Sequence, residues 1–379
     1  MSPIRVGLVG LAPKGPEAAF IGLWSVIAHL PSIQALPEYE LVAVANSTVE
    51  SAQKSIDSHG LPSSVKAYGS PEDLADDPDV DLVVVSVQVG KHFRLAKPAI
   101  LKKKNVFVEW PLGASLEESE ELTKLASANG IKTTVGVQGQ PSKYSLKMRE
   151  LIAGGKIGKV LSTSVSASSS FVKNSWLQSA QYILDMDSGG NEFTVVFGHF
   201  LHSFIDVLGN FSEVQGLLKT QHPDVNILSP GGEVVDPAYK KTAPDDIFVQ
   251  GILESGALAS INFFKSETPV SDKRSFVWRI TGTEGEIELA SPEMVWQIGN
   301  PAARITIRVG KSGEPQEVEL DSQDPAISAG VPFMGQNTAL VYDAYAKGDT
   351  SRYATFEQAT QTHRLLQKIL VASNFREYV

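Results

Sequence analysis

Residues 4–46 decide how this chain folds. They read IRVGLVG (4–10), LAPKG (11–15) and PEAAFIGLWSVIAHL (16–30), followed after a short connection by ELVAVAN (40–46). Two β-rich runs that flank a glycine-containing turn and an apolar helical run predict one βαβ unit. The first turn of such a unit points backbone N–H groups and the positive end of the helix toward an anion. We therefore expect a nucleotide to bind at this turn.

The alternation of strand and helix signals continues to residue 137. Capping boxes that begin at Ser47 and Ser115, and a serine–proline pair at Ser70, predict three helix starts. The apolar run 81–87 is typical of a central parallel strand that is buried on both faces. The other expected elements are a helix over 92–104 and strands over 105–109 and 131–137. This order predicts a doubly wound parallel sheet of the Rossmann type in a first domain, residues 1–138.

Beyond residue 138 the pattern changes from alternation to a long series of β signals. Helices are expected over 142–153 and 189–209, a strand over 159–171, hairpins over 247–264 and 276–289, strands over 294–298 and 305–309, and a final helix over 356–372. Residues 221–245 are expected to form a long surface loop. This order predicts a second α/β domain, residues 139–379, with an open, mostly antiparallel sheet and a C-terminal helix.

The composition narrows the class of protein. The chain has 379 residues, of which 42% are hydrophobic and 20% charged, as is typical of a globular protein. Its 33 Lys and Arg against 43 Asp and Glu give a net charge of −10, which argues against a general nucleic-acid binder. The lack of cysteine excludes disulfides, thiolate metal sites and a cysteine nucleophile. Neither a secretion leader nor a long apolar run is apparent, so we expect a cytoplasmic protein without a membrane partner.

The glycine turn matches the usual dinucleotide fingerprint only in part. After Gly10, the second glycine of the pattern is replaced by Ala12, and the turn to Gly15 is longer than usual. Asn46 ends the second strand, where an acid would bind the ribose hydroxyls of NAD. The neutral amide removes the repulsion of a 2′-phosphate, although no arginine follows it to attract one. NAD and NADP both remain open as cofactors, with NADP favoured.

Two histidines, His199 and His202, lie three residues apart on one face of an expected helix. Such a pair can bind a metal ion, but this helix offers no third ligand at a suitable spacing, so we predict no metal site. The spacing alone favours one histidine in the core and one that is partly exposed.

Four longer segments resemble one family of enzymes. They are VDLVVVSVQVGKHFRLAKPAILKKKNVFVEWPLG (80–113), MRELIAGGKIGKV (148–160), GGNEFTVVFGHFLHSFIDVLG (189–209) and VWRITGTEG (277–285). In this order they resemble the glucose-fructose oxidoreductase and inositol dehydrogenase family. The resemblance implies a nicotinamide-binding Rossmann domain, then a domain whose first helix carries a catalytic histidine and whose open sheet supports homodimers or tetramers. It also implies small hydroxyl compounds, such as sugars and polyols, as substrates.

The resemblance also implies which residues contact the cofactor. Ligands of such sheets bind in the loops at the carboxyl ends of the strands. The family pattern places the pyrophosphate at the glycine turn, the ribose at Asn46 and the nicotinamide half near the later loops. The cofactor residues expected on this basis are Gly10, Leu11, Ala12, Gly15, Asn46, Ser47, Ser86, Val87, His92, Glu109, Trp110 and Gln138.

Two positions depart from the family pattern. The family's lysine, which holds the substrate hydroxyl, is Trp110 here, and the aspartate one helical turn before the histidine is Val195. An indole ring can stack on a nicotinamide or a sugar, but it cannot relay a proton as an ammonium group can. These departures resemble the branch of the fungal galactose-regulon repressor and its enzyme-like relatives.

Two functions therefore remain open. The favoured one is an NAD(P)-dependent oxidoreductase that transfers a hydride between nicotinamide and a sugar, polyol or related hydroxyl or carbonyl compound. His199 is its expected acid–base group, with His202, Tyr144 or Tyr182 as candidate helpers. The alternative is a non-catalytic, dinucleotide-sensing regulator that binds a transcription-regulator partner.

Overall fold

The computed structural model describes residues 2–15, 23–169, 174–266, 274–294, 296–298, 300–322 and 324–375. Helix residues 16–22 and strand residues 170–171, both expected from the sequence, lie outside the described residues. The chain divides into two compact units. The first comprises Met1–Gln138, Ser188–Gly190 and Gln323–His363, and the second comprises Gly139–Asp187, Asn191–Ser322 and Arg364–Val379.

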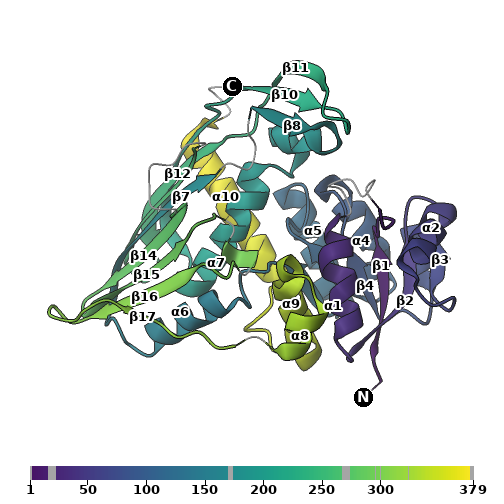
Figure 1. The fold of residues 1–379 in the computed structure, drawn as a ribbon, viewed down its shortest axis with the longest axis horizontal. Coiled ribbons are helices and arrows are strands. Elements are labelled where there is room, and N and C mark those ends of the chain that lie inside the picture. The colour runs from purple at the N-terminus through teal and green to yellow at the C-terminus, as the bar shows by residue number, and fades with distance from the viewer. Residues whose placement is uncertain are drawn as a thin grey trace. The chain divides into compact units, whose positions relative to one another are not determined.

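The first unit is built on a sheet of six parallel strands, as the sequence predicts (Figure 1). The strands are β1 (Ile4–Val9), β2 (Tyr39–Ala45), β3 (Lys66–Tyr68), β4 (Leu82–Val85), β5 (Asn105–Glu109) and β6 (Thr133–Gly136). Their order in the sheet is β3-β2-β1-β4-β5-β6. The winding direction reverses between β1 and β4, and the crevice at such a reversal is the usual ligand site of a doubly wound sheet.

The helices of this unit mostly begin where the sequence predicts. They are a π-helix (Ser25–His29), α1 (Leu30–Ala35), α2 (Val49–His59), α3 (Pro71–Asp76), a 3₁₀ turn (Val89–Lys91), α4 (His92–Leu101) and α5 (Leu116–Asn129). Ser70 and Ser115 cap α3 and α5. The expected cap Ser47 is wrong by one residue, because the Thr48 hydroxyl accepts from the Ser51 amide and the Ser51 hydroxyl accepts from the Thr48 amide. Helix α4 ends at Leu101, three residues earlier than expected.

The later segment 324–363 adds to the core of the first unit. Helices α8 (Pro325–Gly330) and α9 (Gln336–Lys347) follow each other around a 3₁₀ turn (Phe333–Gly335), and both contact α1. Tyr342 is fully buried in one cluster with Leu8, Ile33 and Phe107. The sequence assigns these residues to the second domain, whereas in the structure they group with the first unit.

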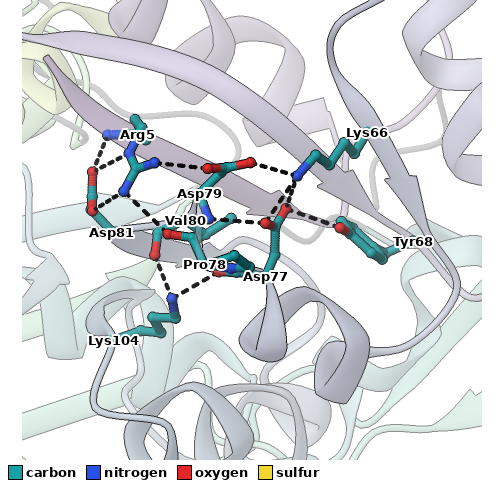
Figure 2. A network of polar contacts seen from close by, with 9 residues as sticks. All are labelled: Arg5, Lys66, Tyr68, Asp77, Pro78, Asp79, Val80, Asp81 and Lys104. Atoms are coloured by element: carbon teal, nitrogen blue, oxygen red, sulfur yellow. Dashed lines mark hydrogen bonds and ion pairs between the residues drawn. The ribbon is translucent and has the colours of Figure 1, made fainter.

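A network of polar and charged side chains lies at the amino-terminal ends of the strands of the same sheet (Figure 2). The Arg5 guanidinium donates to both carboxylate oxygens of Asp81 at 2.9 Å, and this bond holds the pKa of Asp81 below its usual value. The Asp77 carboxylate accepts from Lys66 at 3.0 Å and from Tyr68 at 2.9 Å. These bonds fasten the starts of β1, β3 and β4 to the loop before β4. The network lies at the edge opposite the carboxyl ends of the strands, so we regard it as structural.

The second unit contains an eight-stranded, mostly antiparallel sheet in the order β17-β16-β15-β14-β7-β13-β12-β9 (Figure 1). Its strands are β7 (Val160–Ser169), β9 (Phe211–Lys219), β12 (Asp246–Leu253), β13 (Leu258–Lys265), β14 (Phe276–Gly282), β15 (Gly285–Ser291), β16 (Arg304–Val309) and β17 (Gln316–Glu317). Both predicted hairpins are confirmed. Only the β7–β13 pair among these described strands runs parallel.

Helices α6 (Lys143–Ala153) and α7 (Gly198–Leu208) and the later part of α10 (Phe356–Ser373) belong to this unit as well. Phe200 and Phe204 of α7 make ring contacts with Trp278 on β14, at centroid distances of 5.6 Å and 5.5 Å. Aromatic packing therefore fixes α7 against the inner face of the sheet.

Two expectations for this unit are wrong. Residues 221–245 are not a loop, because β10 (Asp224–Leu228) and β11 (Val234–Lys240) pair there and join β8 (Ser175–Leu177) in a three-stranded sheet. Alternate residues of β10 such as Val225 and Ile227 are fully buried, but the polar residues between them hide this pattern. The expected strand 294–298 is instead a 3₁₀ turn at Trp296–Ile298, where the Trp296 ring is buried.

Among the described helices, none combines the length and the apolar character that crossing a membrane would require.

Candidate functional site

A pocket of about 420 Å³ opens at the carboxyl ends of β1, β2 and β4 in the first unit. Seven residues expected at the cofactor line it, namely Gly10, Leu11, Ala12, Asn46, Ser47, Ser86 and Val87. Five others, Gly15, His92, Glu109, Trp110 and Gln138, are not part of its lining. The pocket therefore joins the glycine turn to the loop after β2 and the loop after β4.

Gly10 is required by the geometry of this pocket. Its φ of +97° is unfavourable for other residues, and a Cβ atom there would lie 2.4 Å from the carbonyl oxygen of Ser86. The Ser25 hydroxyl donates to the carbonyls of Gly10 and Ser86, at 2.9 Å and 3.3 Å. The turn after β1 thus lies directly on the turn after β4. Gly15 also has a positive φ, of +151°, but a Cβ there would meet open space.

The turn that lacks the second glycine is held by helix α2. The Ser55 hydroxyl donates to the Leu11 carbonyl at 2.7 Å, and Nε2 of His59 lies 2.8 Å from the Ala12 carbonyl oxygen. The Lys14 amide donates to the Ser58 hydroxyl at 3.0 Å. Side chains of α2 therefore order a turn that in the usual fingerprint is shaped by glycines.

Asn46 has a structural role that the sequence does not reveal. Its amide NH₂ group donates to the carbonyls of Leu11 and Ser51 and lies 3.1 Å from the Ser55 hydroxyl. These three acceptors occupy the amide nitrogen and fix the orientation of the amide. The side chain links the two turns and brings no negative charge to the ribose position.

Glu109 is bound inside the first unit. One of its carboxylate oxygens lies 2.9 Å from Nε2 of His29, and the other accepts from the Gln138 amide at 3.1 Å. Nδ1 of His29 lies 2.8 Å from the Tyr342 hydroxyl. Glu109 and Gln138, both expected near the nicotinamide, are thus tied to each other and to the first helical segment.

Trp110 and His92 are buried beside this network. The Trp110 ring lies 4.7 Å from the ring of His363, and Nε2 of His363 accepts from the Leu112 amide at 3.2 Å. Both ring nitrogens of His92 face carbonyl oxygens, those of Pro111 and Val87, at 2.8 Å and 3.0 Å. Burial lowers the pKa of His92, while these two carbonyls act in the opposite direction. His92 therefore connects the loops after β4 and β5.

Helix α7 of the second unit carries the two expected catalytic histidines. Asn191 caps a π-helix (Glu192–Phe197) that continues into α7. His202 is buried, and its Nε2 lies 3.3 Å from Oε1 of Gln140. Burial, with a smaller contribution from His199, lowers the pKa of His202 to about 3. His199 is half-buried. Of the two, His199 is therefore the group that solvent can reach.

Gln140, in the loop after β6 that the sequence marks as a ligand-binding loop, is a neighbour of His202. Gly139 packs so closely on α7 that a Cβ atom there would lie 2.1 Å from the Ser203 hydroxyl. The Ser145 hydroxyl fixes the same segment by donating to the Gly139 carbonyl at 2.7 Å. In the sequence, the position of Gly139 between Gln138 and Gln140 is the feature that could have predicted this close contact with α7.

The two candidate helper tyrosines have different surroundings in the second unit. Tyr144 is fully buried, and its hydroxyl donates to the Asn300 carbonyl at 2.6 Å. Tyr182 packs against the small cluster of Ile183, Val225 and Ile227, and burial raises its pKa. The Tyr144 hydroxyl is therefore already used inside the second unit. Among the described residues, no three His, Asp or Glu side chains gather as metal ligands.

Residues 17–137 match the family model described as an oxidoreductase family with an NAD-binding Rossmann fold, and residues 144–291 match the C-terminal domain of Gal80p. The dehydrogenase aclE of Aspergillus oryzae is 28% identical over 370 residues, which are 97% of this chain and 95% of that protein. The galactose/lactose metabolism regulatory protein GAL80 of Kluyveromyces lactis is 30% identical over 309 residues, which are 79% of this chain and 66% of that protein.

The fold agrees with these matches. A super-repressor mutant of Gal80p from Saccharomyces cerevisiae has a TM-score of 0.84 at 23% identity, over 98% of this chain and 97% of that chain. The predicted combination of a Rossmann sheet and a mostly antiparallel second sheet is confirmed. The chain therefore belongs to the NAD-binding oxidoreductase family of glucose-fructose oxidoreductase and inositol dehydrogenase, and its second part is of the Gal80p type.

Proposed function

We propose that this protein is a nicotinamide-dependent oxidoreductase acting on a sugar, a polyol or a related small hydroxyl or carbonyl compound. The observation that carries the proposal is the pocket at the reversal of the parallel sheet, where the Gly10 turn packs directly on the turn after β4. Such a pocket fits the pyrophosphate and adenosine of a dinucleotide. The nicotinamide ring, when bound, supplies or accepts the hydride.

His199 is the proposed acid–base group. It is half-buried on α7, whereas its neighbour His202 is buried and neutral near pH 7. A positioned imidazole can take the hydroxyl proton during oxidation of an alcohol and return it during reduction of a carbonyl. His202 and Gln140 hold the helix surface beside it and do not themselves need to titrate.

The first test is binding followed by turnover. Quenching of tryptophan fluorescence should show saturable binding of NADPH or NADH to the full chain. Absorbance at the nicotinamide band should then change with at least one member of a panel of sugars, polyols and carbonyl compounds. Failure of both dinucleotides to bind would overturn the proposal as a whole. Binding without turnover on every panel member would overturn its catalytic part.

The second candidate is a dinucleotide-binding regulator with a protein partner. It is favoured by Trp110, which replaces the family's lysine. The Trp110 side chain is only 5% exposed and its ring contacts that of His363. The regulatory protein GAL80 among the relatives is consistent with it. The turnover measurement separates the two functions, because a regulator would bind the dinucleotide and leave it unchanged.

We further propose that two copies of this chain associate as a homodimer through the exposed face of the eight-stranded sheet. Leu217, Phe248 and Leu258 share that face by register and are 66%, 36% and 60% exposed. A groove of about 680 Å³ runs over the same strands. Burial of large exposed apolar side chains is a common driving force for association.

Leu258→Glu should shift the protein from dimer to monomer, because it places a charge in the proposed interface. Light scattering after size-exclusion chromatography measures this change directly. Leu101→Glu, at a 53% exposed leucine on α4, is the matched control and should leave the mass unchanged. A wild-type chain that is monomeric at micromolar concentration would contradict the proposed dimer.

A further inference from the structure

The charged side chains that line the nucleotide pocket are both cationic. They are Lys91 at the end of the 3₁₀ turn and Arg94 in the first turn of α4, and none of the described residues of the lining is acidic. Both side chains are exposed, and within the described parts of the chain neither makes a hydrogen bond or an ion pair. By contrast, Lys97 and Lys102, further along the same helical segment, pair with Glu121 and Asp76. Of these four cations, the two without a partner among the described residues are those at the pocket.

Their place in the pocket points to the adenosine half of a dinucleotide. The same lining includes Asn46 and Ser47 from the end of β2, where the adenosine ribose of a Rossmann dinucleotide lies. Gly69 and Pro71, which follow β3, complete this side. The pyrophosphate is instead expected at the Gly10 turn. Lys91 and Arg94 line the same pocket from the segment after β4.

The charge balance there distinguishes the two dinucleotides. NAD-specific sites place an acid on the ribose hydroxyls, whereas NADP-specific sites place an arginine near the 2′-phosphate. Here the acid is replaced by Asn46, whose NH₂ group is already bound to Leu11 and Ser51. No arginine follows β2, but the lining includes Arg94 from the later helix α4.

We infer that Lys91 and Arg94 form a 2′-phosphate subsite and that this protein binds NADP(H) in preference to NAD(H). The inference rests on the proposed dinucleotide binding. A guanidinium can bind a phosphate through two parallel hydrogen bonds, and such charge-assisted bonds are stronger than neutral ones. NADH lacks the phosphate, so these two side chains contribute little to its affinity.

The test is calorimetric titration of the full chain with NADPH and with NADH, in the absence of substrate. Wild type should bind NADPH at least about tenfold more tightly, as expected for a charge-assisted phosphate contact. Arg94→Ala should weaken NADPH binding by roughly tenfold to a hundredfold and change NADH binding by less than about twofold. Lys91→Ala should act in the same direction with a smaller effect. The combined variant should bind the two dinucleotides about equally.

Two further variants sharpen the test. Lys97→Ala, on the same helix but outside this pocket, should leave both affinities unchanged. Ser47→Asp places a carboxylate at the exposed ribose side and should weaken NADPH more than NADH. Unchanged thermal melting of the alanine variants would show that exposed residues were altered without loss of fold.

The possible failures are distinguishable. Equal wild-type affinity for NADPH and NADH, or equal weakening of both by Arg94→Ala, overturns the 2′-phosphate subsite while dinucleotide binding stands. Equal weakening by Arg94→Ala would show that Arg94 binds a group that both dinucleotides share. A wild-type chain that binds neither dinucleotide overturns the proposed function and the subsite together.

Discussion

His199→Ala should lower kcat for NADP(H)-dependent turnover by about two to four powers of ten, the usual contribution of a positioned acid–base group. The tyrosines that the sequence offers as substitutes have other contacts in the structure. The Tyr144 hydroxyl is bound to the Asn300 carbonyl in the core, and Tyr182 packs against a small hydrophobic cluster. Because Trp110 replaces the family's lysine, no ammonium group at that position is left to take over the proton. The affinity for NADPH should change little, since His199 does not line the nucleotide pocket.

The control is His222→Ala, which removes another imidazole of the second unit, outside α7. It should keep wild-type kcat. His199→Gln keeps a side chain of similar size and should be as inactive as His199→Ala if proton transfer, and not packing, is what is lost. If wild type and both His199 variants have the same kcat, His199 is not the acid–base group.

The pH dependence provides a second readout of the same residue. Because burial lowers the pKa of His202 to about 3, this imidazole is neutral throughout the usual assay range and its protonation begins only at acidic pH. Imidazoles in ordinary surroundings titrate between about pH 5 and 8. Protonation of His202 therefore cannot cause a falling limb of alcohol oxidation in that range. His199→Gln should remove this limb from the kcat profile.

Much of the fold can be predicted because local signals and burial agree. Continuous apolar runs such as 81–87 mark strands that are covered on both faces, and Ser70, Ser115 and Gly130 mark helix ends by their hydrogen bonds and backbone conformation. The β10–β11 pair is missed because few of its side chains are buried, so the sequence shows no clear apolar alternation. Polar residues such as Asp224, Asn226 and Asp236 then dominate its appearance in the sequence.

The candidate site is harder to predict because its residues come from different strands. The sequence identifies Gly10 by its position after β1, but it does not show that the Asn46 amide is used up by neighbouring carbonyls. A search for an arginine after β2 cannot find Arg94, which follows β4 and reaches the pocket only through the parallel order of the sheet. Long-range placement, not residue type, is the information that one sequence lacks.

Lys241 shows the same difficulty in the second unit. In the sequence it follows Lys240 inside a segment expected to be a surface loop, yet its side chain is fully buried. Its ammonium group is bound to the Glu192 carboxylate and lies 3.3 Å from that of Asp245. Asp245 also accepts from the backbone amides of Gln221 and His222, at 2.6 Å and 3.1 Å. Glu192 begins the π-helix that continues into α7, so this buried group holds the start of the helix that carries His199.

Lys241→Met should lower the free energy of unfolding by about 3–5 kcal/mol, because it leaves the Glu192 carboxylate buried without its partner charge. Urea denaturation followed by tryptophan fluorescence measures the loss. Lys240→Ala is the matched control one residue away. Its ammonium group pairs with Asp224 on the surface and is 76% exposed, so its removal should cost less than about 1 kcal/mol.

The double variant Lys241→Met with Glu192→Gln tests the cause of that loss. Replacing both partners of a buried ion pair is often nearly neutral, whereas removing one is costly. The double variant should therefore recover most of the stability, while Asp245 remains satisfied by its two backbone amides. A double variant as unstable as Lys241→Met would show that packing of the lysine stem, and not its charge, holds the start of the π-helix. Because Glu192 begins the π-helix that leads into α7, Lys241→Met should also lower kcat, and the double variant should regain it if charge is the cause.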